Sequence, residues 1–330
     1  MIFALLLTIV VGLALYETGY GVTNTWFRSL RKQLIVQGSA AAGLLTNMLL
    51  IGNIQELTPM DWAINLGFLS MLAYTATATI KECHLTALTS AIIGGLLFPL
   101  LLHVIGPAGY LTSVGFTDVA GAGIVHFVGG IIALFASIYT THVIKKTQPI
   151  VIRPYSATVG FLVLWIGWIS YIALLSLPIL QNSAESWLRG IVNMSSATAW
   201  GAVAAVGYMW IASGRVKMRT CTVGGLAGMV AMSADPFAAP LWGAALIGAL
   251  GGVAATFAYG LLCKFKVSDP NNGISIHMIP GLMGLLVAPL FSSALFVSQA
   301  FGAAILLILA GTMGVVVCEV HNLTKHTNSA

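Results

Sequence analysis

The chain has 330 residues, of which 58% are hydrophobic and only 7% are charged, and its formal net charge is +5. A soluble domain carries about 25% charged residues, so this composition cannot cover a water-facing surface. These values exclude a soluble globular protein and indicate an integral membrane protein in contact with a lipid bilayer. Glycine, with 36 residues, is frequent enough to predict closely packed helices.

Eleven apolar runs of membrane-spanning length follow one another along the chain. They cover about 2–20, 34–53, 62–80, 86–106, 120–143, 156–180, 188–212, 220–234, 240–263, 274–292 and 296–320. Short segments rich in turn residues, such as QELTPMD and VSDPNNG, separate them. The sequence therefore predicts an all-α polytopic membrane protein with eleven transmembrane helices, forming one domain over 1–320. Residues 321–330 are predicted to form a short cytoplasmic tail.

The basic residues predict how the chain is oriented. If the N-terminus lies outside, 13 of the 14 basic residues fall in cytoplasmic connections, and only Arg189 falls on the other side. The positive-inside rule therefore predicts a plasma or inner membrane protein with its N-terminus outside and its C-terminus in the cytoplasm. Because the charges follow topology in this way, we ascribe them to orientation and lipid contact, and we expect no nucleic-acid partner.

Two histidines interrupt the apolar runs at matching places. His126 lies in the fifth run, within GAGIVHFVGG, and His277 lies in the tenth, within SIHMIPG; each is followed four positions later by a glycine. Because five is an odd number of spans, a second set of five would run in the opposite direction. We therefore expect two inverted five-helix repeats, at about 2–143 and 156–292, with 296–320 as an extra helix.

Ionisable residues at membrane depth are costly and most often functional. The two histidines could be hydrogen-bonded structural residues, haem ligands, or the lining of a narrow path for a small polar solute. We predict no metal site, because no cysteine or carboxylate lies nearby at helical spacing and HExxH is absent. We expect no cofactor, and an absorption spectrum tests the haem alternative. Neutral histidine both donates and accepts hydrogen bonds, which suits a path that handles a proton.

Four segments resemble motifs of the ammonium transporter/Rhesus (Amt/Rh) family. DVAGAGIVHFVGG (118–130) resembles the fifth-helix motif, WIGWISY (165–171) the sixth, DPNNGISIHMIPGLMG (269–284) the tenth and GLALYETGYG (12–21) the first. Their order and spacing match along almost the whole chain. The resemblance implies an ammonium-binding homotrimer that is not itself an enzyme, with a narrow hydrophobic pore in each subunit.

The resemblance implies that six residues bind ammonium or line the pore: His126, His277, Phe68, Trp168, Tyr171 and Asp118. The two histidines would lie at the pore centre, the aromatic residues at the entrance, and Asp118 near the outer mouth, where it organises helix ends. An aromatic entrance can hold the ammonium cation by cation–π attraction of on the order of 1–2 kcal/mol. Ammonium can then release a proton and cross as neutral ammonia, which avoids the cost of burying a charge. Potassium cannot do so.

The outer vestibule departs from the family pattern. Tyr171 stands at a phenylalanine position and is followed by Ile172, Ile105 stands at the fourth-helix tryptophan position, and Leu175 stands at the vestibule serine position. This pattern resembles sensor-type Amt proteins, in which an Amt module is joined to a cytoplasmic signalling domain such as a histidine kinase or diguanylate cyclase. We therefore expect a sensor module that perceives external ammonium and signals through its last helix. The alternative is an ammonium transporter.

Two further positions depart from the family pattern. Glu17 stands at a tyrosine position of the first-helix motif, and Asn272 stands at an aspartate position five residues before the second histidine. Because an acidic side chain is costly inside a membrane, we expect Glu17 to pair with Arg28 or Lys32. It could instead belong to a switch that responds to ammonium. The sequence ends at HNLTKHTNSA, which we interpret as a sensor module separated from its output domain or as a minimal transporter.

Overall fold

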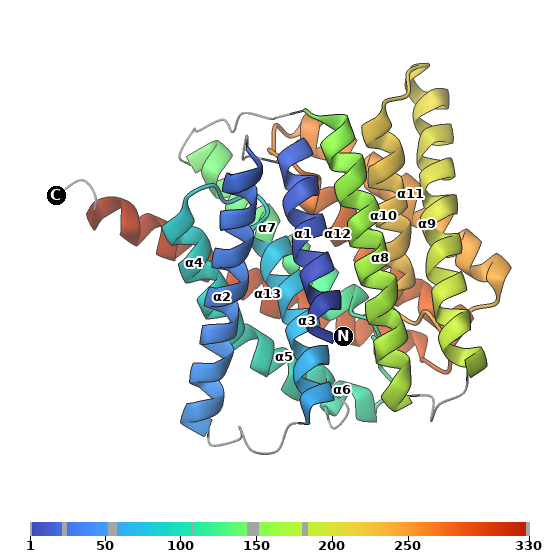
Figure 1. Cartoon of the computed structure of the whole chain (residues 1–330), viewed down its shortest axis with the longest axis horizontal. Helices are drawn as coiled ribbons and strands as arrows, with labels where there is room; N and C mark the ends of the chain where they lie inside the picture. The colour runs from blue at the N-terminus through green and yellow to red at the C-terminus, as the bar shows by residue number, and fades with distance from the viewer. Residues whose placement is uncertain are drawn as a thin grey trace.

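The computed structural model describes residues 2–21, 25–51, 58–106, 109–143, 152–179 and 184–327. Within these ranges every regular element is helical. The helices stand side by side in one bundle, and α1 (Ile2–Tyr20), α2 (Trp26–Ile51) and α3 (Pro59–Thr77) run next to one another along it (Figure 1). The predicted all-α fold is confirmed.

The remaining segments also follow the predicted order. The first half continues with α4 (Cys83–Ile92), η2 (Ile93–Leu97), α5 (Phe98–Ile105), α6 (Tyr110–Ser113), η3 (Ala122–Phe127), α7 (Val128–Ile138) and η4 (Tyr139–Val143). The second half contains α8 (Pro154–Ile179), α9 (Ala184–Ser213), α10 (Met218–Met232), α11 (Leu241–Lys264), α12 (Gly273–Val287), η5 (Ala288–Leu290) and α13 (Phe296–Thr327). Segments that follow without a break, such as α4, η2 and α5, form one span. The eleven predicted runs thus correspond to eleven helical spans within the described residues.

The composition and surface of these helices fit a membrane. Seven segments are long and apolar enough to cross one, and apart from 107–108 all their residues are described: 26–51, 83–113, 122–142, 154–176, 241–264, 273–290 and 296–324. Leu50, Ile211 and Val297 are each more than 80% exposed. Large apolar side chains exposed in this way indicate a surface that faces lipid rather than water.

Glycines allow the helices to touch backbone to backbone. A Cβ atom at Gly94 in η2 would collide with the carbonyl oxygen of Ala40 in α2, and a Cβ atom at Gly252 in α11 would collide with that of Gly201 in α9. No residue larger than glycine fits at either crossing without a backbone shift. The close packing predicted from the glycine content is therefore present on both sides of the bundle.

The ends of the helices separate the charged connections. Because successive spans alternate in direction, the described basic residues outside α9 lie at the side where α1 ends, which is the upper side in Figure 1: Arg28, Arg31, Lys32, Lys81, Arg153, Arg215, Lys217, Arg219, Lys264 and Lys266. We call it the predicted cytoplasmic side. Lys145 and Lys146 lie outside the described residues, as does the side chain of Lys325.

The last helix is longer than its predicted span. α13 continues without a break to Thr327, so the described part of the predicted tail is helical; residues 328–330 lie outside the described residues. Its final turns extend past the side of the bundle (Figure 1). Near that end His321 is only 3% exposed and its ring lies 6.2 Å from the ring of Tyr139 in η4. This contact fixes the end of α13 against the fifth span.

Candidate functional site

His126 of η3 and His277 of α12 meet at the centre of the bundle. Their Nδ1 atoms lie 2.9 Å apart, and their rings are stacked with centroids 4.9 Å apart. The side chains are 1% and 7% exposed. At this distance one Nδ1 atom carries a hydrogen and the other accepts it, so if both rings are neutral they have opposite tautomers. Within the described ranges, no three His, Cys, Asp or Glu residues gather so as to hold a metal ion.

The glycine four residues after each histidine explains how the rings come together. A Cβ atom at Gly130 would lie 2.6 Å from the backbone nitrogen of Met278, and one at Gly281 would lie 2.5 Å from the carbonyl oxygen of Ala122. Each glycine therefore packs against the helix that carries the other histidine. The histidine and glycine pattern occurs twice because each of the two helices needs a glycine where it crosses the other closely.

The turn that holds His126 is wider than an ordinary α-helix. Its backbone N–H donates to the carbonyl oxygen of Gly121, five residues earlier, at 3.1 Å. Gly121 has a φ of +86°, a left-handed conformation that glycine adopts without a steric penalty. π-type turns of this kind occur frequently at functional sites, because they change the direction in which one side chain projects.

Asp118 caps the same helix. Its Oδ2 atom accepts hydrogen bonds from the backbone N–H groups of Gly123 (3.0 Å) and Ile124 (2.8 Å). Its Oδ1 atom is buried and has no hydrogen-bond partner among the described residues. Burial raises the pKa of Asp118 to about 7, while the backbone N–H groups act to lower it. Asp118 is thus a helix cap with one oxygen left for a further donor.

Asp269 repeats this arrangement before the second histidine. Its Oδ1 atom accepts a hydrogen bond from the N–H of Ile274 (3.0 Å), and its Oδ2 atom accepts from the N–H of Ser275 (2.9 Å). Burial raises the pKa of this carboxyl as well. Asp269 was not predicted as a site residue from the sequence, although it precedes His277 by the same eight residues that separate Asp118 from His126. The same eight-residue spacing therefore precedes both histidines, and the inverted repeats stay a prediction.

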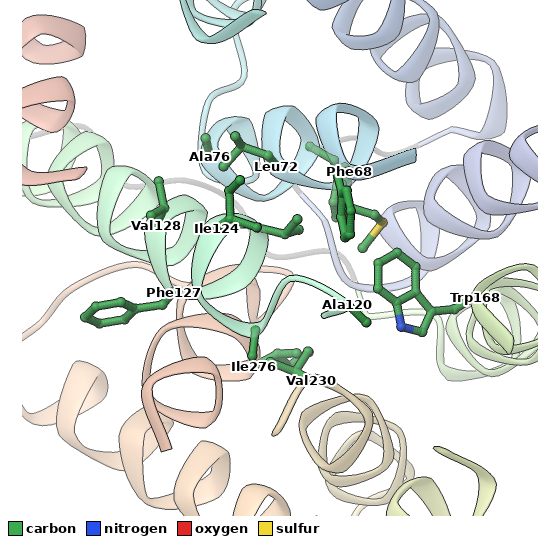
Figure 2. Close-up of a cluster of buried hydrophobic side chains, with 14 of the residues drawn as sticks. Phe68, Leu72, Ala76, Ala120, Ile124, Phe127, Val128, Trp168, Val230 and Ile276 are labelled. Atoms are coloured by element: carbon green, nitrogen blue, oxygen red, sulfur yellow. The ribbon is translucent and has the colours of Figure 1, made fainter. Parts of the chain in front are cut away.

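The three aromatic residues form a continuous stack beside the histidines. The ring of Trp168 lies 5.6 Å from that of His126 and 5.2 Å from that of Tyr171, which in turn meets Phe68 edge-on at 5.5 Å. Trp168 is fully buried, and Figure 2 shows it near Phe68 within a buried apolar cluster. The Tyr171 hydroxyl donates a hydrogen bond to the carbonyl oxygen of Ile64 at 2.6 Å. The stack therefore runs without a break from the His126 ring to Phe68.

Two buried nitrogen atoms in this stack are unsatisfied. Trp168 Nε1 and His126 Nε2 have no hydrogen-bond partner among the described residues. Buried polar atoms are almost always paired, so an ordered water or a small hydrogen-bonding solute would satisfy these two. The altered vestibule positions are buried and apolar, with Ile105 9% and Leu175 3% exposed. They supply no hydroxyl to such a solute.

Glu17 lies on α1, nearer the predicted cytoplasmic side, and is fully buried. Its Oε1 atom lies 2.8 Å from Lys32 Nζ, which confirms one of the two expected pairings. Its Oε2 atom accepts a hydrogen bond from Gln33 Nε2 at 3.0 Å. Gln33 was not predicted as a partner of Glu17, because the sequence around a glutamine at the start of a span does not indicate which residue it contacts.

Arg219 was expected only to orient the chain, but it holds the loop before the second histidine. Its Nε donates to Asn272 Oδ1 (2.6 Å) and its Nη2 donates to the Pro270 carbonyl oxygen (2.9 Å). The guanidinium lies over the rings of Tyr20 and Tyr259, at 5.2 and 5.0 Å. The departure at Asn272 is thus accommodated by a hydrogen bond from Arg219.

Comparison with known proteins places the chain in a family. A model of the Ammonium Transporter Family matches residues 1–326. The chain is 27% identical over 270 residues to the ammonium transporter Amt2 of Archaeoglobus fulgidus, covering 75% of this chain and 57% of that protein. It is 27% identical over 269 residues to the putative ammonium transporter sll1017 of Synechocystis sp., covering 78% of this chain and 60% of that protein. The chain therefore spans less than two thirds of the length of either relative.

Solved structures share the fold. The structure titled Sensor Amt Protein matches with a TM-score of 0.84 and 22% identity, over 98% of this chain and 92% of that chain. Rh50 of Nitrosomonas europaea matches with a TM-score of 0.78 and 25% identity, over 98% of this chain and 86% of that one. Because the family model covers all but the last four residues and these folds superpose along almost the whole chain, the protein belongs to the Ammonium Transporter Family.

Proposed function

We propose that this chain is an ammonium-binding membrane module that perceives external ammonium and signals to a cytoplasmic output domain through α13. Family membership supports ammonium as the ligand. The observation that carries the sensor role is the closed aromatic stack, in which Trp168 is fully buried and the Tyr171 hydroxyl is bonded to the Ile64 carbonyl. Conduction past this stack would require that bond to break.

Binding follows from the chemistry of the six residues named from the sequence. The rings of Phe68, Tyr171 and Trp168 attract a cation, and the unpaired Asp118 oxygen favours positive charge near that side. A cation that moves further meets the buried histidines, where a charge is costly. There ammonium lowers its energy by giving up a proton, and His126 Nε2 provides a hydrogen-bonding atom without a partner.

The route of the signal is α13. This helix packs against α7, which follows His126, and it reaches Thr327 on the predicted cytoplasmic side. A bound ammonium ion shifts the bundle only to the extent that it binds one of two conformations more tightly. The contact between His321 and Tyr139 joins the end of α13 to η4, in the span that begins with His126. We propose a homotrimer with one such site in each subunit, and an outside N-terminus.

The alternative is a transporter that conducts ammonium or ammonia through a twin-histidine pore in each subunit. The names of the two relatives favour it, since both are given as ammonium transporters, one of them putative. Under this alternative the same rings would act as a gate that opens during each transport cycle.

The test is ammonium-evoked current from purified protein in proteoliposomes, with ammonium binding measured on the same preparation. A His126→Ala/His277→Ala variant is the control. Binding without a sustained current, weakened in the variant, supports the sensor module. A sustained current that is lost or becomes unselective in the variant replaces it with the transporter. If the folded wild-type protein neither binds ammonium nor carries current, both proposals fail.

A further inference from the structure

We infer that Glu17 is a second ammonium site, which the side-chain ammonium group of Lys32 occupies in this structure. The inference rests on the proposed function, because it assigns the same ligand to a second place nearer the predicted cytoplasmic side. Under it, Lys32 is a tethered competitor: ammonium that reaches Glu17 takes its place, and the lysine is released.

The geometry is that of a cation held by a buried carboxylate. The Glu17 and Lys32 side chains are 0% and 3% exposed, and Glu17 Oε1 lies 2.8 Å from Lys32 Nζ. A lysine head group is an alkylammonium ion, with the same charge as ammonium and with N–H donors of the same kind. A carboxylate placed to bind one in this way is placed to bind the other.

The site offers more acceptors than Lys32 uses. In the part of the chain that the structure describes, Glu17 is the one acceptor for the three hydrogens of Lys32 Nζ. Gln33, whose amide nitrogen donates to Glu17 Oε2 at 3.0 Å, has a buried Oε1 atom that lacks any partner among the described residues. An ammonium ion has four donors and no carbon stem, so it is free to orient toward acceptors that the tethered Lys32 head group leaves unused.

Exchange between Lys32 and ammonium is feasible because the net free energy of forming a buried ion pair is close to zero. Removing two charges from water costs about as much as their attraction returns, whereas leaving one charge buried alone is strongly unfavourable. Ammonium keeps Glu17 paired while Lys32 regains its hydration. Lys32 lies in the second turn of α2, directly after the exposed Arg31, so its flexible stem is close to the predicted cytoplasmic interface.

Glu17 also lies close to the machinery of the second histidine. The loop before α12 is held from several sides, and the Tyr74 hydroxyl of α3 accepts a hydrogen bond of 3.3 Å from Asn271 in it. One turn along α1 from Glu17, Tyr20 supports Arg219, which holds the same loop. An exchange at Glu17 thus takes place one helical turn from a contact that helps to hold the loop before the helix of His277.

The test compares ammonium binding by Lys32→Met with that of the wild type at pH 8, using ammonium chloride and potassium chloride as separate titrants. Lys32→Met keeps the apolar stem and removes the tethered cation. Lys81→Met, at an exposed lysine on the same side, is the matched control. We expect Lys32→Met to bind ammonium at least tenfold more tightly than wild type and Lys81→Met, or with one further site per subunit. Adding Glu17→Gln abolishes this gain.

The inference is overturned if Lys32→Met shows no gain, if the gain survives Glu17→Gln, or if potassium produces the same gain. These results are separable from the proposed function. Suppose that wild-type protein binds ammonium, that His126→Ala/His277→Ala weakens this binding, and that Lys32→Met binds no more tightly. This result contradicts only the second site. If Lys32→Met binds ammonium while the wild-type protein does not, only the proposed function is contradicted.

A second measurement needs no variant, in case Lys32→Met does not fold. Acetylation of Lys32 by an amine-reactive ester is measured by mass spectrometry as a ratio to Lys81, which cancels the consumption of reagent by ammonium. Displacement predicts that ammonium chloride raises this ratio severalfold in the wild-type protein while potassium chloride does not. An unchanged ratio in protein that binds ammonium overturns the inference.

Discussion

The hydroxyl group of Tyr171 on α8 donates a hydrogen bond of 2.6 Å to the carbonyl oxygen of Ile64 on α3. It ties one ring of the aromatic stack to the backbone of a different span. The ring also fills the space in front of Gly67, where any Cβ atom would collide with it. The position of the Tyr171 side chain is therefore fixed both by the hydrogen bond of its hydroxyl group and by the contact of its ring with Gly67.

Replacing Tyr171 by phenylalanine keeps the ring and removes this bond. We expect a loss of about 1 kcal/mol in the free energy of unfolding, the usual contribution of one hydrogen bond. The ring should also move more freely, so ammonium-evoked current in proteoliposomes should rise above the wild-type level. Tyr155→Phe, at a side chain that is 85% exposed, is the control for stability. If current and stability are both unchanged, the bond does not hold the stack closed.

The reciprocal glycines predict a position-specific effect of one methyl group. A Cβ atom at Gly281 would lie 2.5 Å from the carbonyl oxygen of Ala122, so Gly281→Ala must push α12 away from η3. We expect a loss of about 1–3 kcal/mol in stability, typical of overpacking, and several-fold weaker ammonium binding as the histidines separate. Gly311→Ala, where nothing lies within 4 Å, should leave both unchanged. Equal behaviour of the two variants would contradict the close-crossing explanation.

Asp118 predicts a pH dependence of stability. Because burial raises its pKa in the folded protein to about 7 from the ordinary value of 3.8, the folded state binds more protons than the unfolded state between these values. The contribution of Asp118 to stability is therefore greatest below pH 4, falls as the pH rises toward 7, and is level above that. The unfolding temperature of Asp118→Asn relative to wild type should rise from pH 5 to pH 8. A constant difference would show that the carboxyl does not titrate in this range.

Arg219 should not be replaceable by lysine. Lysine lacks the planar fork that reaches both Asn272 and Pro270, and it stacks less well between two rings. We expect Arg219→Lys to lower the free energy of unfolding by about 2 kcal/mol, the scale of a hydrogen bond to a charged group. Arg215→Lys, at an exposed arginine in the same connection, should have no measurable effect. Thermal unfolding of both variants decides whether the charge alone is sufficient.

The fold was largely predictable because hydrophobicity alone determines how a chain crosses a bilayer. The eleven apolar runs became eleven helical spans, with ends shifted by up to eight residues where polar residues such as Arg28 and Lys32 continue a helix. The contact between His126 and His277 was also foreseeable, because matched positions in the two predicted repeats imply a shared centre. Asp269 was foreseeable in the same way from its spacing to His277, provided that the residues before the two histidines were also compared.

Other parts of the site could not be predicted, because they depend on tertiary contacts between distant segments. Nothing in the sequence near Arg219 indicates that it holds a loop fifty residues further on. Tyr171 differs from phenylalanine only by its hydroxyl group. The acceptor of that hydroxyl is a backbone carbonyl, and the sequence does not indicate which backbone carbonyl a hydroxyl will reach. Glu17 could be expected to find a cation, whereas the amide of Gln33 as its second partner could not.

The glycine crossing between α9 and α11 has a mechanical consequence. A contact made of Cα and carbonyl atoms contains no rotamers, so it cannot be exchanged for an alternative packing as a contact between long side chains can. Gly201 meets Gly252 on α11 and Gly224 on α10 in this way. The helices α9, α10 and α11 therefore pack as one rigid unit. By the same argument α2 is joined rigidly to η2 where Gly94 meets Ala40, so any movement within the bundle must occur at contacts made by side chains, such as that of Glu17 with Lys32 between α1 and α2.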